Sequence, residues 1–115
     1  MAMATKSGWV VEIPLKATQK EIRGLPKSLQ AKFARVKRTI ENEGLDDISH
    51  KYKEKVREGL WEMRLSGKGV IARSLYLKPM GRRVIIVHVF IKKKPKIDPH
   101  HINIALQRAK EIENA

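Results

Sequence analysis

The chain has 115 residues, 42% of them hydrophobic, which suffices for one modest core and predicts a single domain over residues 1–115. Lysine and arginine number 25 against 12 acidic residues, and the formal net charge of +13 favours an anionic partner such as nucleic acid. With no cysteine, no apolar run of membrane-spanning length and no export signal, the sequence excludes disulfides and cysteine-based zinc sites and predicts a cytoplasmic protein without membrane contact.

The first part of the chain predicts a short strand and a short helix. Residues 9–13 are β-prone and end at Pro14, a pattern typical of an edge strand. Thr18 and Glu21 have the spacing of a capping box, which predicts that they open a short helix. Gly24 is expected to end it.

A second helix is predicted after Pro26, since helices tolerate proline in their first turn. Its apolar side chains recur at intervals of three and four positions, and Gly44 marks its end. These stripe residues are Leu29, Phe33, Val36 and Ile40. Residues 45–57 show no clear periodicity and are expected to form a loop.

The second half of the chain predicts three strands and a last helix. Residues 60–65 alternate between apolar and polar side chains, and a turn with two glycines joins them to Val70–Leu77. Arg83–Ile91 is almost entirely apolar, as is typical of a central strand covered on both faces. Asp98 and Pro99 have the residue types of a helix N-terminus. The order β-α-α-β-β-β-α predicts an α+β fold.

Positive charge is concentrated in the predicted strands and in the loop after them. Residues 60–97 contain ten basic side chains and one acidic side chain, Glu62, which gives this stretch a net charge of +9. Because charges on a sheet are held in place, the pattern predicts a nucleic-acid surface. Residues 92–96 include four lysines before the last helix, where they either grip phosphate or form a solvated connector.

Arg73 is the most informative single residue of this basic stretch. It alternates with Ile71 and Leu75 on the more apolar face of its strand, where a guanidinium is costly unless it finds an anion. Arginine is a good bidentate partner for phosphate, which favours a functional role. The alternatives are that Arg73 reaches off the sheet or pairs with a carboxylate such as Glu62. Arg64 projects away from the expected core and can share a surface with Arg73.

Histidines and aromatic residues supply the other candidates for chemistry. His88 lies in the most apolar strand and is interpreted as a hydrogen-bonded core residue, whereas His100 and His101 begin the last helix beside the lysines. An ordinary histidine pKa near 6.5 suits proton transfer. Trp61 shares its face with core residues, and Tyr76 is the candidate for stacking on a base. No metal-ligand spacing or phosphate-binding glycine loop is present, so no metal or cofactor is predicted.

Three ordered blocks of sequence resemble the phage-derived, HigB-like branch of the RelE/ParE toxin superfamily. The blocks are GLWEMR at residues 59–64, IARSLY at 71–76 and HVFIKK at 88–93, and residues 105–109 are similar to that branch's closing helix. The resemblance implies a small antiparallel sheet with an N-terminal helical hairpin and a C-terminal helix. It also implies the toxin of a type II toxin–antitoxin pair.

The resemblance further implies a metal-independent endoribonuclease that cuts mRNA on the ribosome by 2′-hydroxyl attack on the adjacent phosphate. The tyrosine that RelE carries in its last helix is missing here, and His100 or His101 can stand in for it. The expected catalytic residues are Arg64, Arg73, Lys92, Lys93 and His101. The expected RNA-binding residues are Lys68, Tyr76, Arg82, Arg83, Lys94 and Lys96.

The expected partners are a cognate antitoxin, taken to be a helix-turn-helix protein of the HigA type, together with mRNA and the ribosome. Operator DNA is expected to be contacted through the antitoxin alone. Two other functions stay open: a ParE-like toxin that inhibits gyrase, and a relative that binds nucleic acid without cutting it. The set of cations favours the endoribonuclease, because inhibition of gyrase does not require phosphate chemistry.

Overall fold

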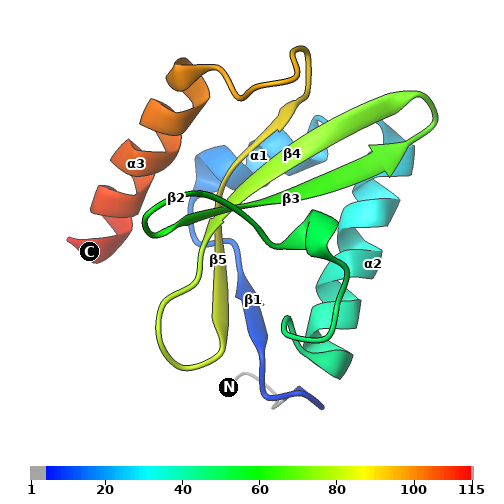
Figure 1. Cartoon of the computed structure of the whole chain (residues 1–115), viewed down its shortest axis with the longest axis vertical. Coiled ribbons are helices and arrows are strands. Elements are labelled where there is room, and N and C mark those ends of the chain that lie inside the picture. Colours follow the sequence, from blue (N-terminus) through cyan, green and yellow to red (C-terminus); the bar gives the residue numbers. More distant parts are fainter. Residues whose placement is uncertain (1–4, 115) are drawn as a thin grey trace.

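The computed structural model describes residues 5–114, which form a five-stranded sheet with helices packed on both faces (Figure 1). The elements in chain order are β1 (Val10–Glu12), α1 (Lys16–Arg23), α2 (Lys27–Glu43), a short 3-10 helix (His50–Tyr52), β2 (Glu54–Arg57), β3 (Leu60–Gly67), β4 (Val70–Leu77), β5 (Arg83–Ile91) and α3 (Pro99–Glu113). The strand order in the sheet is β1-β5-β4-β3-β2. The predicted α+β fold, with its helical hairpin and C-terminal helix, is confirmed.

The sheet differs from the prediction at its two edges. β1 pairs with the start of β5 in parallel, so the sheet is mixed, whereas β2, β3, β4 and β5 pair antiparallel in succession. β2 lies within the segment for which the sequence predicts a loop. Its residues are mostly exposed and polar, and an edge strand of this kind shows no apolar alternation that would reveal it.

Helices α2 and α3 bury their apolar stripes against opposite faces of the sheet, as Figure 1 shows. The four predicted stripe residues of α2 are all buried, and Gly44 ends the helix at a φ of +90°, a conformation that favours glycine. On the other face, α3 packs through Ile102, Ala105 and Ile112. Asp98 caps α3 as predicted, its carboxylate accepting a hydrogen bond from the amide of His100.

Helix α1 packs against the part of β5 that lies beyond the end of β1. β1 pairs with residues 83–85 of β5, and beyond them two side chains of α1 bond to the β5 backbone. The Thr18 hydroxyl donates to the Val87 carbonyl (2.7 Å), and the Glu21 carboxylate accepts from the Val89 amide (3.0 Å). The predicted capping box is therefore wrong. The helix begins two residues before Thr18, so both side chains lie within it and serve a strand distant in sequence.

Candidate functional site

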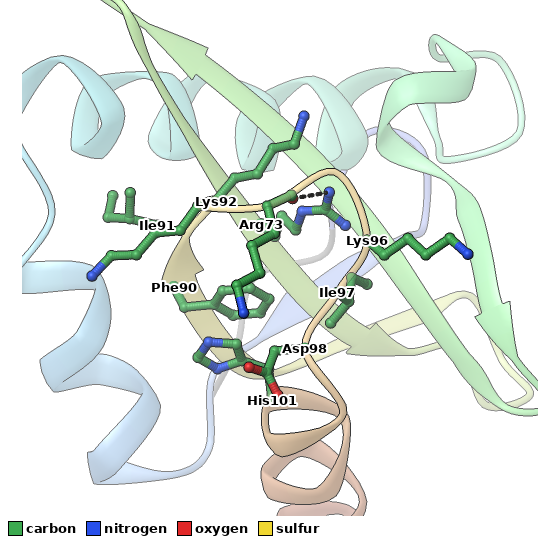
Figure 2. A pocket seen from close by; sticks show the side chains of 10 residues that line it. Arg73, Phe90, Ile91, Lys92, Lys96, Ile97, Asp98 and His101 are labelled. Carbon is green, nitrogen blue, oxygen red and sulfur yellow. Dashed lines mark hydrogen bonds between the residues drawn. The ribbon is translucent and has the colours of Figure 1, made fainter.

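A cleft of about 360 Å³ opens where β5 ends and α3 begins (Figure 2). Its floor includes Phe90 of β5, its rim is the loop of residues 92–98, and His101 from the first turn of α3 closes one side. Six of the predicted site residues line this cleft: Arg73, Lys92, Lys93, Lys94, Lys96 and His101. The fold thus gathers the lysine loop and a histidine around one cavity.

Arg73 supports this loop from within the protein. It is buried, with 5% of its surface exposed, and its Nη1 atom donates to a Glu62 carboxylate oxygen at 2.8 Å. Its Nη2 atom donates to the backbone carbonyls of Lys94 (3.3 Å) and Pro95 (2.6 Å). The prediction that Arg73 binds phosphate directly is therefore corrected. Its hydrogen bonds are directed at the protein, and pairing with Glu62 is the alternative that the structure adopts.

The four lysines of the loop are left free to face an anion. Lys93, Lys94 and Lys96 are exposed, while Lys92 is partly buried and its backbone amide donates to the Ile71 carbonyl at 2.7 Å. The acidic residue that lines the cleft is Asp98, whose pKa is lowered by the hydrogen bond from the amide of the second α3 residue. The cleft therefore combines a fixed backbone with an excess of positive charge.

His101 presents a half-buried imidazole to the cleft. Its ring stacks on Phe90 with centroids 3.7 Å apart and planes 8° from parallel. Its Nδ1 atom lies 2.8 Å from Nε2 of His88. Burial lowers the pKa of His101 below the ordinary 6.5, and the neighbouring His88 adds to the effect. The imidazole is therefore mainly neutral at pH 7 and able to accept a proton.

Behind His101 lies a polar cluster of Glu21, His88 and Arg108. The Nδ1 atom of His88 lies 3.1 and 3.0 Å from the two Glu21 oxygens, and Arg108 donates to Glu21 at 2.9 Å. Burial alone would raise the pKa of Glu21, but hydrogen bonds from His88, Arg108 and the Val89 amide outweigh it and lower the pKa to about 2. The interpretation of His88 as a hydrogen-bonded core residue is confirmed, whereas no local sequence pattern reveals its partners.

The family profile described as "Phage derived protein Gp49-like" matches residues 20–110 of the chain. This protein belongs to that family. The Gp49-like family is one of toxin–antitoxin-associated toxins, and membership suggests a cognate antitoxin as partner. The matched segment of this Gp49-like protein contains every residue that lines the cleft. No curated protein sequence matches the chain.

Two predicted basic residues of this Gp49-like protein lie away from the cleft, and a third is beside it but outside its lining. Arg82 and Arg83 are at the start of β5, about 26 Å from its cleft end at 3.3 Å per residue. Arg83 makes two hydrogen bonds with Glu12 (2.7 and 3.0 Å), and Arg82 donates to the Ser7 carbonyl. Arg64 projects from β3 and pairs with the carboxylates of β2 and β3 rather than lining the cavity. Arg82 and Arg83 are therefore separate from the candidate site, whereas Arg64 lies opposite Arg73 on the neighbouring strand.

The two remaining predicted residues, Lys68 and Tyr76, have opposite environments. Lys68 is exposed in the β3–β4 turn, at the same end of the sheet as the cleft although outside its lining. Tyr76 is fully buried, and its hydroxyl donates to the Tyr52 carbonyl at 2.8 Å. Burial raises the pKa of Tyr76. The prediction that Tyr76 stacks on a base is wrong, because its ring is enclosed in the core on the α2 face.

Within residues 5–114, no helix of this Gp49-like protein is long and apolar enough to cross a bilayer. The same residues contain no cluster of three or more histidine and carboxylate side chains arranged to hold a metal ion. The ionisable groups that line the cleft include the four lysines, the Asp98 carboxylate and the His101 imidazole.

Proposed function

We propose that this protein is the toxin of a type II toxin–antitoxin pair, of the RelE/HigB type, and that it cuts mRNA on the ribosome as a metal-independent endoribonuclease. One observation supports this function above the others. A neutral imidazole and four lysines line the same cleft, a combination that suits cleavage of an RNA phosphodiester.

The proposed reaction uses the RNA's own 2′-hydroxyl as nucleophile. A base removes the 2′-proton, the 2′-oxygen bonds to the adjacent phosphorus, and the bond from phosphorus to the 5′-oxygen breaks. The products are a 2′,3′-cyclic phosphate and a 5′-hydroxyl, which takes up one proton. DNA lacks the 2′-hydroxyl, so the reaction is specific for RNA.

His101 is the proposed base because its lowered pKa keeps it unprotonated at neutral pH. The ammonium groups of Lys92, Lys93 and Lys94 hold the phosphates and offset the charge that develops on the reacting phosphate. One of these lysines donates the proton to the leaving oxygen. Arg73 contributes by fixing the loop that carries them, which replaces the direct role expected from the sequence.

The proposed regulator is a helix-turn-helix antitoxin of the HigA type, which carries the pair to operator DNA. Electrostatic steering would draw acidic antitoxin side chains to the lysine loop, so complex formation should slow as salt rises. Ribosome-bound mRNA as substrate places the protein in the cytoplasm.

The chemistry is tested with purified protein on ribosome-bound mRNA, in the presence of EDTA. The expected product ends in a 2′,3′-cyclic phosphate, and a single 2′-deoxy substitution at the cut site should abolish cleavage. His101→Ala should reduce the rate by about 10²-fold or more. His100→Ala is the matched control, because His100 is adjacent but lies outside the cleft lining. Equal rates for both variants, or cleavage of the deoxy substrate, would contradict the proposal.

The cellular setting is tested by inducing the protein without its antitoxin and pulse-labelling the cells. Translation should stop first, and cut mRNA should be mapped by primer extension. If DNA synthesis stops first while translation continues, gyrase is the target and the endoribonuclease proposal fails.

A further inference from the structure

Three titratable side chains from three different elements form a continuous chain that ends in the cleft. Glu21 of α1 bonds to Nδ1 of His88 in β5, and Nε2 of His88 lies 2.8 Å from Nδ1 of His101 in α3. His88 is 4% exposed, so water does not replace either of its partners. The proposed cleavage reaction uses the last member of this chain and leaves the role of the first two open.

The order of donors and acceptors along the chain follows from its first member. The pKa of Glu21 is about 2, so its carboxylate is ionised near neutral pH and can only accept hydrogen bonds. His88 must therefore carry a proton on Nδ1. When Nδ1 carries the single proton of His88, its Nε2 atom is an acceptor, and the hydrogen bond with His101 then requires a proton on Nδ1 of His101.

We propose that Glu21 and His88 are positioning residues that hold His101 in the tautomer protonated at Nδ1, with the unprotonated Nε2 directed to the cleft. Nε2 is the only ring atom of a neutral imidazole in this tautomer that can accept a proton. The catalytic role of this tautomer rests on the proposed function. The tautomer itself is a property of the protein without RNA and can be measured separately.

The same chain stabilises the protonated state that follows proton abstraction. When Nε2 of His101 takes the 2′-proton, the ring becomes an imidazolium whose Nδ1 still donates to His88. His88 in turn donates to the Glu21 carboxylate, so the new positive charge faces a chain that ends in a negative charge. No further proton has to leave or enter for this stabilisation.

Several charged and titratable groups around His101 influence how readily it takes up a proton. The titratable and charged groups around it are His88 from β5, Glu21 from α1, Asp98 and His100 at the start of α3, and the lysines of the cleft. Arg108 of α3 also contacts the chain, since it donates to Glu21 and to the Val87 carbonyl. Arg108 thereby keeps the carboxylate in place and ionised. The charges of His88 and His100 oppose protonation of His101, whereas those of Asp98 and Glu21 favour it.

The tautomer is tested by nitrogen-15 NMR of the histidine side chains in the isolated protein. The expected spectrum of wild-type His101 shows a protonated Nδ1 and an unprotonated Nε2 at pH 7.5. Glu21→Gln replaces a group that only accepts with one that also donates, so its spectrum should show a mixture of His101 tautomers. Glu12→Gln is the matched control, because Glu12 also binds an arginine but at the far end of β5. A wild-type His101 protonated at Nε2 would overturn the inference.

The kinetic test uses two variants of His88 that differ in one property. The amide oxygen of His88→Gln can accept from Nδ1 of His101, whereas His88→Leu offers no acceptor. We expect His88→Leu to lower kcat about 10²-fold with little change in KM, and His88→Gln to recover at least tenfold of this loss. Thermal unfolding of both variants controls for stability. Equal kcat values for the two would assign His88 a purely structural role and overturn the inference.

The two proposals fail in different ways. If the wild-type protein cuts no RNA while His101 shows the expected tautomer, the proposed function is wrong and the positioning geometry stands. If RNA is cut but the tautomer is the opposite one, the function stands and the positioning role of Glu21 and His88 is rejected.

Discussion

Replacing Arg73 by methionine should destabilise the protein far more than the same change at Arg83. Both arginines bind a glutamate, at 2.8 Å for Arg73 and 2.7 Å for Arg83. Their environments differ, since the Arg73 side chain is 6% exposed and that of Arg83 is 46% exposed. Solvent screens the exposed pair, and such pairs contribute little to stability.

The magnitude for Arg73 follows from the charge that the substitution leaves behind. Removing one partner of a buried ion pair typically costs about 3–5 kcal/mol, because the other charge stays buried without compensation. Arg64 lies 3.9 Å from Glu62 and offsets part of that penalty. We therefore expect a loss near the lower end, about 3 kcal/mol, from a total that is about 5–15 kcal/mol for a domain.

Urea unfolding measures this loss directly. With a slope of about 1.5 kcal/mol per molar urea, the midpoint of Arg73→Met should fall by about 2 M. The double variant Glu62→Leu/Arg73→Met leaves no unpaired charge and should be more stable than Arg73→Met alone. Equal midpoints for Arg73→Met and Arg83→Met, or a double variant no more stable than the single one, would refute the reasoning.

Three other changes test separate features. The pKa of Glu21 in the folded protein is about 2, below its ordinary 4.5, so its ionised carboxylate stabilises the fold fully above pH 4.5 and this stabilisation is lost as the pH falls towards 2. Over this range the urea midpoint of the wild type should fall more than that of Glu21→Gln. Parallel curves for the two proteins would contradict this. Tyr76→Phe removes one hydrogen bond and should cost about 1 kcal/mol in urea unfolding. Its RNA cleavage should be unchanged, whereas a large loss of cleavage would reinstate base stacking. In Gly67→Ala the new methyl would lie 2.8 Å from an α2 side-chain oxygen and should lower the thermal midpoint. Gly24→Ala, where the nearest atom is 3.5 Å away, should not, and equal midpoints would count against this contact.

Elements whose stability depends on repeated local patterns could be predicted from the sequence. The α2 stripe is an example: Leu29, Phe33, Val36 and Ile40 recur at helical spacing, and all four are buried. The α3 cap is another, since the Asp98 side chain bonds two residues along the chain. In both cases the residues that make up the pattern follow one another within about one helical turn, where sequence spacing determines which side chains share a face or a cap.

The site depends on contacts for which sequence spacing gives no guide. Thr18 and Glu21 have capping-box spacing, yet they bind a strand 69 and 68 positions away in sequence. Arg73 shows the same limit. Its apolar strand face correctly predicts that the guanidinium needs an anion, but whether that anion is a carboxylate or a phosphate depends on which residues fold around it. The lysine loop and His101 were predicted together because they adjoin each other in the chain.

Arg73 fixes the backbone of the loop, so the shape of the cleft does not depend on which side chains the loop carries. The guanidinium donates hydrogen bonds to the backbone carbonyls of Lys94 and Pro95. Every amino acid has a backbone carbonyl, so these bonds do not depend on the side chains at the two positions. The side chain of Lys94 can therefore change without disturbing the anchor. Variants with other residues at Lys93, Lys94 or Lys96 should keep the loop conformation while altering which nucleotides or antitoxin side chains it accepts. Under the proposed function, the rim is where Gp49-like proteins can differ in specificity at little cost to folding.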